Sequence, residues 1–197
     1  MQAIRYKRHF LILIFAVTVL WLVMKAGDAV PAGDARFFLF FGGMGALHAS
    51  SLVISLRDRT AVTLVRAVVF ITLVAVLSAV APFSFVVLMP FLNLLGDSLR
   101  LLFALAFASA FGASGYWLLL RWFWMKSLRP VSLITTALLC ATATVLAWPG
   151  AGRLMPLTRD IGDLLPTVAW WAAFSLSLYW GDRQGSRWRI SSNSASG

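Results

Sequence analysis

The side chains that could do acid–base, nucleophilic or metal chemistry are few in this chain of 197 residues. It contains two histidines, His9 and His48, one cysteine, Cys140, and seven acidic residues, none of which is glutamate. His9 lies beside a basic N-terminal segment, which leaves His48 alone among apolar residues. A lone imidazole cannot build a zinc site or hold a haem iron from both sides. We therefore expect no metal ion and no cofactor.

His48 lies in "GGMGALHASS", residues 42–51, a stretch rich in small side chains. Gly42 and Gly45 allow a neighbouring helix to approach closely. Two interpretations of His48 follow. In the first, the neutral imidazole forms an interhelical hydrogen bond to a carbonyl or hydroxyl group. In the second, it is a titratable gate or a substrate contact in a cavity that Trp170 and Trp171 also line.

A second small-residue stretch, "ASAFGASG", covers residues 108–115. Small residues four positions apart, among them Gly112, are typical of a tight helix crossing. The last four letters are similar to the GxSG motif of rhomboid intramembrane proteases, which implies a nucleophilic role for Ser114. In that family a histidine on the sixth span activates the serine, and the sixth span expected here contains none. Because a serine without a base is a poor nucleophile, we expect Ser114 to pack rather than react.

Other signatures of catalysis are missing from the sequence. It carries no GxxxxGK[ST] phosphate loop and no GxGxxG dinucleotide motif. Asp160 and Asp163 come just before Pro166, so a helix start explains them better than a cation site does. Cys140 is expected to be a small buried residue. We therefore predict no catalytic residue and no enzyme, with a protease-like protein kept as the third alternative.

Long apolar helices must position these side chains, since the chain is 60% hydrophobic and only 12% charged. A helix needs about 20 mainly apolar residues to cross a bilayer. The predicted fold is an all-α polytopic bundle of about six transmembrane spans, in one domain at 1–181. A short, basic, Ser-rich tail at 182–197 is expected to be disordered. The expected spans are at about 10–26, 37–56, 61–80, 98–120, 131–148 and 164–180.

Several expectations concern the ends of these spans. Residues 83–95, with Pro90 inside, are too short to cross and predict an interfacial or re-entrant segment. Asp97 is expected to cap the helix that follows and to pair with Arg100. The tryptophans near the expected cytoplasmic ends predict an interfacial belt: Trp117, Trp122, Trp124 and Trp180.

The basic residues that give the net charge of +10 are unevenly distributed among the loops between the expected spans. By the positive-inside rule, the basic loops and both termini are cytoplasmic, which predicts a multi-pass protein of the cell inner (plasma) membrane. Such loops contact the anionic lipid surface of the bilayer, so no nucleic acid is expected as a partner. Lys25 and the long first apolar run favour an uncleaved first helix over a signal peptide. The basic residues in alternate loops are Arg5, Lys7, Arg8, Arg57, Arg59, Arg121, Lys126, Arg129, Arg183, Arg187 and Arg189.

Two classes of function agree with this sequence. The first is a non-catalytic integral subunit or accessory component of a larger membrane assembly, with partner membrane proteins or further copies of itself. The second is a small transport protein or a substrate-binding transporter subunit. Six spans in about 20 kDa resemble the membrane components of modular vitamin transporters in size and span count. A cavity near His48 favours transport, whereas a solid bundle favours the subunit.

Overall fold

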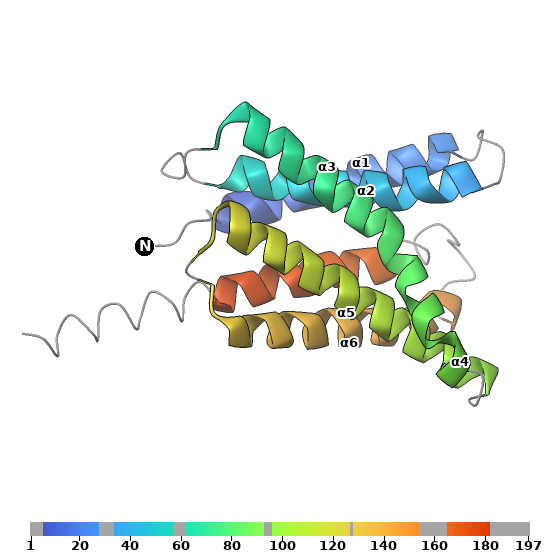
Figure 1. Ribbon diagram of the computed structural model, residues 1–197. Helices are drawn as coiled ribbons and strands as arrows, with labels where there is room; N and C mark the ends of the chain where they lie inside the picture. Colours follow the sequence, from blue (N-terminus) through green and yellow to red (C-terminus); the bar gives the residue numbers. More distant parts are fainter. Residues whose placement is uncertain are drawn as a thin grey trace, which may run out of the picture.

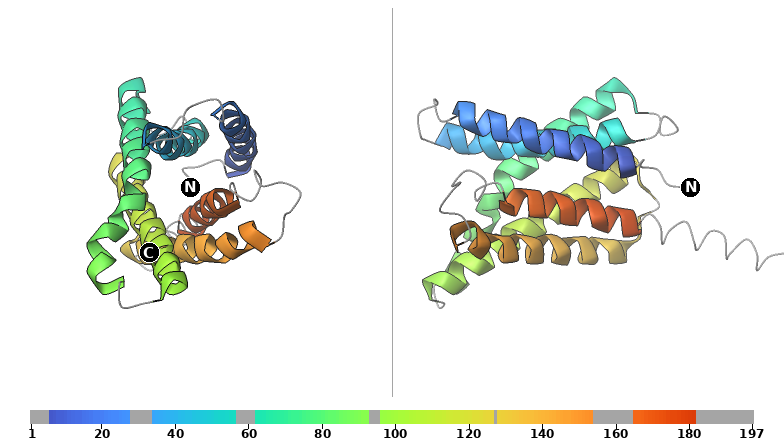
Figure 2. Two further views of the ribbon diagram at one scale, coloured as in Figure 1. Left: turned by 90° about the vertical axis from the view of Figure 1, so that its right-hand side faces the viewer. Right: turned by 180° about the vertical axis from the view of Figure 1, so that it is seen from behind.

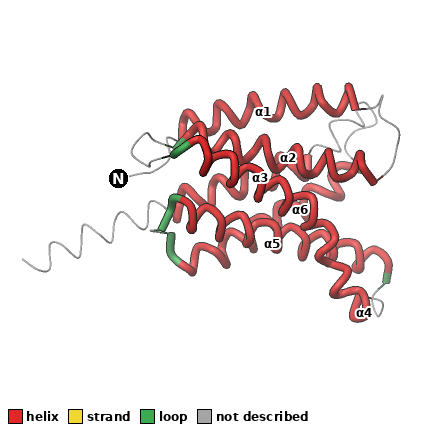
Figure 3. The backbone as a smooth tube through the Cα atoms, turned by 45° about the horizontal axis from the view of Figure 1, so that its top comes forward, coloured by secondary structure: helices red, strands yellow, loops and turns green. Residues whose placement is uncertain are grey.

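The computed structural model describes residues 6–27, 34–56, 62–92, 96–126, 128–153 and 165–181, and the elements that these residues form are helices (Figures 1 and 3). The expected all-α class is therefore confirmed. The disordered tail predicted at 182–197, and Asp160 and Asp163, lie outside the described residues. The helices are α1 (Tyr6–Gly27), α2 (Asp34–Ser55), α3 (Leu64–Val80), η1 (Ala81–Leu88), α4 (Met89–Leu92), α5 (Asp97–Phe123), α6 (Pro130–Arg153) and a last helix at 165–181.

Three of the described helical segments are long and apolar enough to cross a membrane. They are Leu64–Leu88, which runs through α3 and η1, Leu99–Phe123 in α5, and Pro130–Ala147 in α6. Shorter apolar helical stretches occupy His9–Val19 and Phe40–Ser55. Length and composition thus support three of the six expected spans.

The last helix lies in the middle of the bundle. Viewed along the helices, residues 165–181 (red) lie between α1 and α2 on one side and α5 and α6 on the other (Figure 2, left). Hydrogen bonds tie this helix to its neighbours: Ser177 accepts from Thr136 of α6 at 2.9 Å, and Trp170 donates from Nε1 to the Ser109 carbonyl of α5 at 3.3 Å. Helix α3 packs on α2 and crosses α5.

Residues 81–92 extend α3 rather than turning back. The 3₁₀ helix η1 and the short α4 follow α3 without a gap and project beyond it at the lower right of Figure 1. Pro82 and Pro90 lie near the two ends of this extension, and proline removes a backbone donor and bends a helix. The expected interfacial or re-entrant segment at 83–95 stays a prediction. Residues 93–95 lie outside the described part.

The N-cap of α5 lies one residue before the position expected from the sequence. Gly96 is the N-cap, and Asp97 is the first residue of the helix. A glycine at the cap offers no side-chain acceptor, so Asp97 acts through its charge near the positive end of the helix dipole. Its expected pairing with Arg100 is confirmed, since Oδ1 of Asp97 lies 3.5 Å from Nη2 of Arg100.

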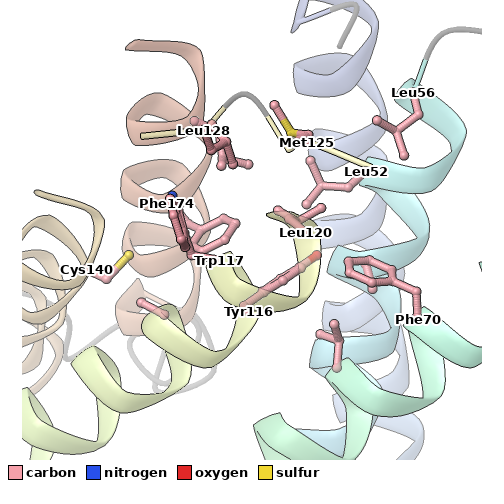
Figure 4. Packing of buried hydrophobic residues seen from close by; sticks show 14 residues of the cluster. Leu52, Leu56, Phe70, Tyr116, Trp117, Leu120, Met125, Leu128, Cys140 and Phe174 are labelled. Atoms are coloured by element: carbon pink, nitrogen blue, oxygen red, sulfur yellow. The ribbon is translucent and has the colours of Figure 1, made fainter. Parts of the chain in front are cut away.

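The main core joins α2, α3, α5, α6 and the last helix (Figure 4). Trp117 belongs to this core, being 1% exposed, and its Nε1 donates to Oγ of Ser132 at 3.0 Å. Trp117 therefore faces the interior of the bundle rather than lipid, and its expected depth at the membrane interface stays a prediction. Trp122 and Trp180 are exposed, as residues of an interfacial belt must be. Cys140 is buried as a free thiol, as expected.

Candidate functional site

His48 is enclosed by aromatic rings at the centre of the bundle. It is fully buried on α2. The Trp171 ring is stacked on it, with 5.2 Å between centroids and 11° between planes, and Tyr116 meets it edge-on at 5.2 Å. Phe174 and Trp170 complete the surroundings at 5.7 and 5.8 Å. Three of these rings come from the last helix and one from α5, so the enclosure exists only in the folded bundle.

The hydrogen bond expected for His48 is not formed with any described residue. Both ring nitrogens, Nδ1 and Nε2, are buried and lack a partner among the described residues. The ring is positioned by contact with its aromatic neighbours instead. Stacked and edge-on aromatic pairs contribute about 0.5–1.5 kcal/mol each beyond the area that they bury.

His9 is the residue beside His48 that sequence reasoning missed. We assigned it to the basic N-terminal segment, but α1 begins at Tyr6 and places His9 on the first turn of the helix. There it is fully buried, its Nε2 is joined to Oγ of Ser175 at 2.9 Å, and its ring centroid lies 6.3 Å from that of His48. The spacing of His9, Leu13 and Ala16 was the available signal, because positions i, i+4 and i+7 share one helix face.

The two histidines bring several unpartnered polar atoms together. Oη of Tyr116 is buried without a partner among the described residues, as are both nitrogens of His48. Buried polar groups are nearly always hydrogen-bonded, and each exception calls for an explanation. We call His9, His48, Ser175, Tyr116 and Trp171 the histidine centre. The described residues contain no group of three His, Cys, Asp or Glu side chains that could hold a metal.

The structure places the expected tryptophans beside His48. Trp171 is buried in the stack with His48. Trp170 is half-buried and is held by two backbone contacts, its Nε1 donating to the Ser109 carbonyl and its own carbonyl lying 3.9 Å from the Cys140 thiol. Trp170 and Trp171 therefore both contact His48, and a shared substrate site stays a prediction.

The glycines of α2 face a different neighbour. A Cβ built on Gly45 lies 2.6 Å from Cβ of Ser78 and 2.9 Å from the Val74 carbonyl oxygen, both on α3. A Cβ on Gly42 lies 3.5 Å from the Ala75 carbonyl oxygen. The two glycines thus form the close crossing of α2 with α3, while His48 points into the bundle.

Gly112 and Ser114 also lie away from the rings around His48. A Cβ on Gly112 would be 3.3 Å from Cβ of Ala81, so this glycine faces the junction of α3 and η1. Ser114 is half-buried on α5, and its hydroxyl makes no hydrogen bond with the described residues. Neither histidine is joined to Ser114 by a hydrogen bond among the described residues: His9 contacts Ser175 and the Ser51 backbone.

No protein-family model, curated protein or solved structure matches this chain.

Proposed function

We propose that this chain is a non-catalytic integral subunit or accessory component of a larger assembly in the inner membrane. In this proposal α1, α2 and the last helix complete a bundle of six spans with the three long apolar segments. Both termini are cytoplasmic, because the basic residues lie in alternate loops of that arrangement. The bilayer and further membrane proteins, or further copies of this chain, are its partners.

The observation that carries the proposal is the closed packing around His48. A transport site requires a cavity that a substrate can enter, but the imidazole is fully buried and four aromatic rings lie within 5.8 Å of it. Trp171, Tyr116 and Phe174 are themselves almost completely buried. Such a solid centre supports a structural bundle.

The outer helices supply surface for lipid or for a partner. Along Leu64–Leu88 only 28% of the most apolar stretch is buried within the chain, and along Pro130–Ala147 only 17%. Val87 and Phe91 are more than two-thirds exposed on the projecting part of η1 and α4. A projecting apolar helix of this kind suits docking against another transmembrane helix, where van der Waals packing drives association.

The experiment that tests the subunit role is purification of the full chain from its native membrane in a mild detergent after brief crosslinking. We expect one or more membrane proteins to co-purify in fixed stoichiometry, or a discrete oligomer of this chain. A matched variant with Val87→Lys on the projecting surface is expected to weaken the association, because a charge there must be desolvated. Recovery of a single monomer without partners contradicts the proposal.

Transport is a second candidate because of the unpartnered polar atoms at the histidine centre. Reaction of a cysteine at position 48 with a small permeant thiol reagent separates the two functions. In a Cys140→Ser background, His48→Cys should stay unreactive in a closed bundle and react rapidly in a transporter with an open path. Phe174→Cys places a thiol at another buried position beside His48, and its reactivity is compared with that of His48→Cys.

A further inference from the structure

We infer that the connection between α5 and α6 binds the phosphate group of one anionic phospholipid through Arg121, Lys126 and Arg129. This inference rests on the membrane placement in the proposed function, but not on the subunit role. Its starting point is a basic cluster without acidic neighbours in the sequence. The three cations lie within residues 121–129, and the chain has no acidic residue between Asp97 and Asp160.

The connection is anchored so that its cations lie at the surface. Met125 and Leu128 are buried in the main core. The N–H of Met125 donates to the Leu120 carbonyl, and that of Leu128 donates to the Met125 carbonyl, each at 2.9 Å. Lys126 and Arg129 each follow an anchored residue and are exposed. The connection therefore presents both cations from a backbone that its hydrogen bonds and buried side chains hold in place.

Arg121 brings a third cation to the same end of the bundle, the end at which α1 begins (Figure 1). It lies in the last turn of α5, one turn after both Trp117 and Leu118. Its guanidinium carbon is 5.5 Å from the centre of the buried Trp117 ring, a cation–π contact that orients the side chain and leaves its charge in place. Neither Arg121 nor Lys126 forms an ion pair with a carboxylate of the described residues. Their charge is thus available to an external anion.

Exposed apolar helix faces next to the cations suit a phospholipid better than a soluble anion. On α5, Leu118 and Trp122 are exposed and lie four residues apart, so they share a face. On α6, Val131 and Ile134 are exposed in the first two turns. A phospholipid has a phosphate group at one end and acyl chains that pack on such faces. Trp122 is a residue type that favours the headgroup level.

The charge of the cluster selects an anionic headgroup. Arginine N–H groups bind phosphate oxygens in pairs, and lysine adds a point charge. Helix α6 begins at Pro130, directly after Arg129, so the positive end of its dipole adds to the cluster. A zwitterionic headgroup carries its own cation beside the phosphate, which weakens the attraction. Basic sites between transmembrane helices on the cytoplasmic side are typical of anionic-lipid binding.

The test is native mass spectrometry of the full chain, delipidated in mild detergent and titrated with phosphatidylglycerol or with phosphatidylcholine of the same acyl chains. We expect one phosphatidylglycerol per chain to bind at least about tenfold more tightly than phosphatidylcholine, because several cations each favour the anionic headgroup. Equal affinity for the two lipids overturns the inference. Uptake of several phosphatidylglycerol molecules without one tighter site also overturns it.

Three single variants assign the site: Arg121→Gln, Lys126→Gln and Arg129→Gln. Each should weaken phosphatidylglycerol binding about fivefold, the factor that one Lys or Arg contributes near an anionic surface, and leave phosphatidylcholine binding unchanged. Arg66→Gln is the matched control, because Arg66 is exposed near the start of α3 at the same end of the bundle (Figure 1). Thermal unfolding identifies a variant that has lost its fold. Unchanged binding in the three folded variants, or equal weakening by Arg66→Gln, overturns the site.

Two further measurements separate the lipid from other occupants. sn-Glycerol 3-phosphate has the phosphate group without acyl chains, so it should not displace an equal concentration of phosphatidylglycerol. Displacement at equal concentration overturns the lipid assignment. A lysine-specific crosslink from Lys126 to an acidic segment of a co-purified protein also overturns it, while supporting the subunit role. Recovery of a monomer with one bound phosphatidylglycerol has the opposite meaning, because it supports the lipid site and contradicts the subunit role.

Discussion

His48 is held by the shape of its surroundings, whereas His9 is held by a hydrogen bond. The first ring has four aromatic neighbours and no hydrogen-bond partner among the described residues, and the second is joined to Ser175. Substitutions at these residues should therefore differ in kind. Loss of a ring next to His48 leaves a void, while loss of the Ser175 hydroxyl leaves a buried nitrogen unpaired.

Ser175→Ala tests the hydrogen bond at the residue scale. Interhelical polar bonds within bilayers contribute about 0.6 kcal/mol on average and at most about 2 kcal/mol. Because His9 and Ser175 are fully buried, we expect a loss in the upper part of that range in the free energy of unfolding, measured by titration with SDS from mild detergent. Ser114→Ala is the control and should change stability by less than about 0.5 kcal/mol. Equal losses in both variants contradict this account.

Gly45→Ala tests the close crossing of α2 and α3. The added methyl group would overlap the Ser78 side chain and lie 2.9 Å from the Val74 carbonyl oxygen. We expect a destabilisation of about 1–3 kcal/mol, the usual cost of overpacking. Gly43→Ala, two residues away, meets no atom within 4 Å and should be neutral or stabilising, since alanine favours a helix over glycine. A thermal unfolding assay in detergent compares the two, and a stable Gly45→Ala variant would show that the helices are farther apart.

Among the elements, the last helix makes the most varied contacts. Ser175 contacts α1, Trp171 contacts α2, Trp170 contacts α5 and Ser177 contacts α6. Ser175 and Trp171 are four residues apart and share the face that meets α1 and α2, whereas Trp170 and Ser177 are seven apart and share the face that meets α5 and α6.

A double-mutant cycle measures one of these contacts between elements. Thr136 of α6 donates to Ser177 of the last helix at 2.9 Å, and both residues are buried. For Thr136→Val and Ser177→Ala we expect a coupling energy of about 0.6 kcal/mol, the average for such bonds in a bilayer. The same cycle with Thr136→Val and Ser50→Ala joins residues that share no bond and should give no coupling. A coupling energy of zero in the first cycle would show that Thr136 and Ser177 do not link α6 to the last helix.

For the whole molecule, orientation in the membrane is the main property that follows from charge. The two ends of α5 provide a clean test because the helix runs from Asp97 to Phe123. The Asp97 side chain is 97% exposed at the first residue of the helix, and Lys126 is exposed just after its last residue. The positive-inside rule places Lys126 in the cytoplasm and Asp97 outside.

Cysteine labelling tests this orientation. In a Cys140→Ser background, Asp97→Cys in intact cells should react with a membrane-impermeant thiol reagent, and Lys126→Cys should react only after the membrane is permeabilised. The Cys140→Ser parent contains no cysteine and gives the background of the labelling. Labelling of Lys126→Cys but not Asp97→Cys in intact cells reverses the topology.

Hydrophobic patterning by itself determined the helical class, because apolar runs of about 20 residues leave few other structures in a bilayer. It also identified the small faces at Gly42 and Gly45, since side-chain size is a local property of the sequence. Proline positions indicated a break after α3, but not whether the chain bends or turns back there.

Only the tertiary structure decided which polar groups meet. His9 and His48 are 39 positions apart, and the rings around His48 come from residues 116–174, so their meeting depends on how four helices pack. Trp117 shows the same limit: its place near a helix end predicted the interface, but the hydroxyl of Ser132 on α6 draws it into the core. Sequence periodicity shows which residues share a face of one helix, whereas packing between helices decides what that face meets.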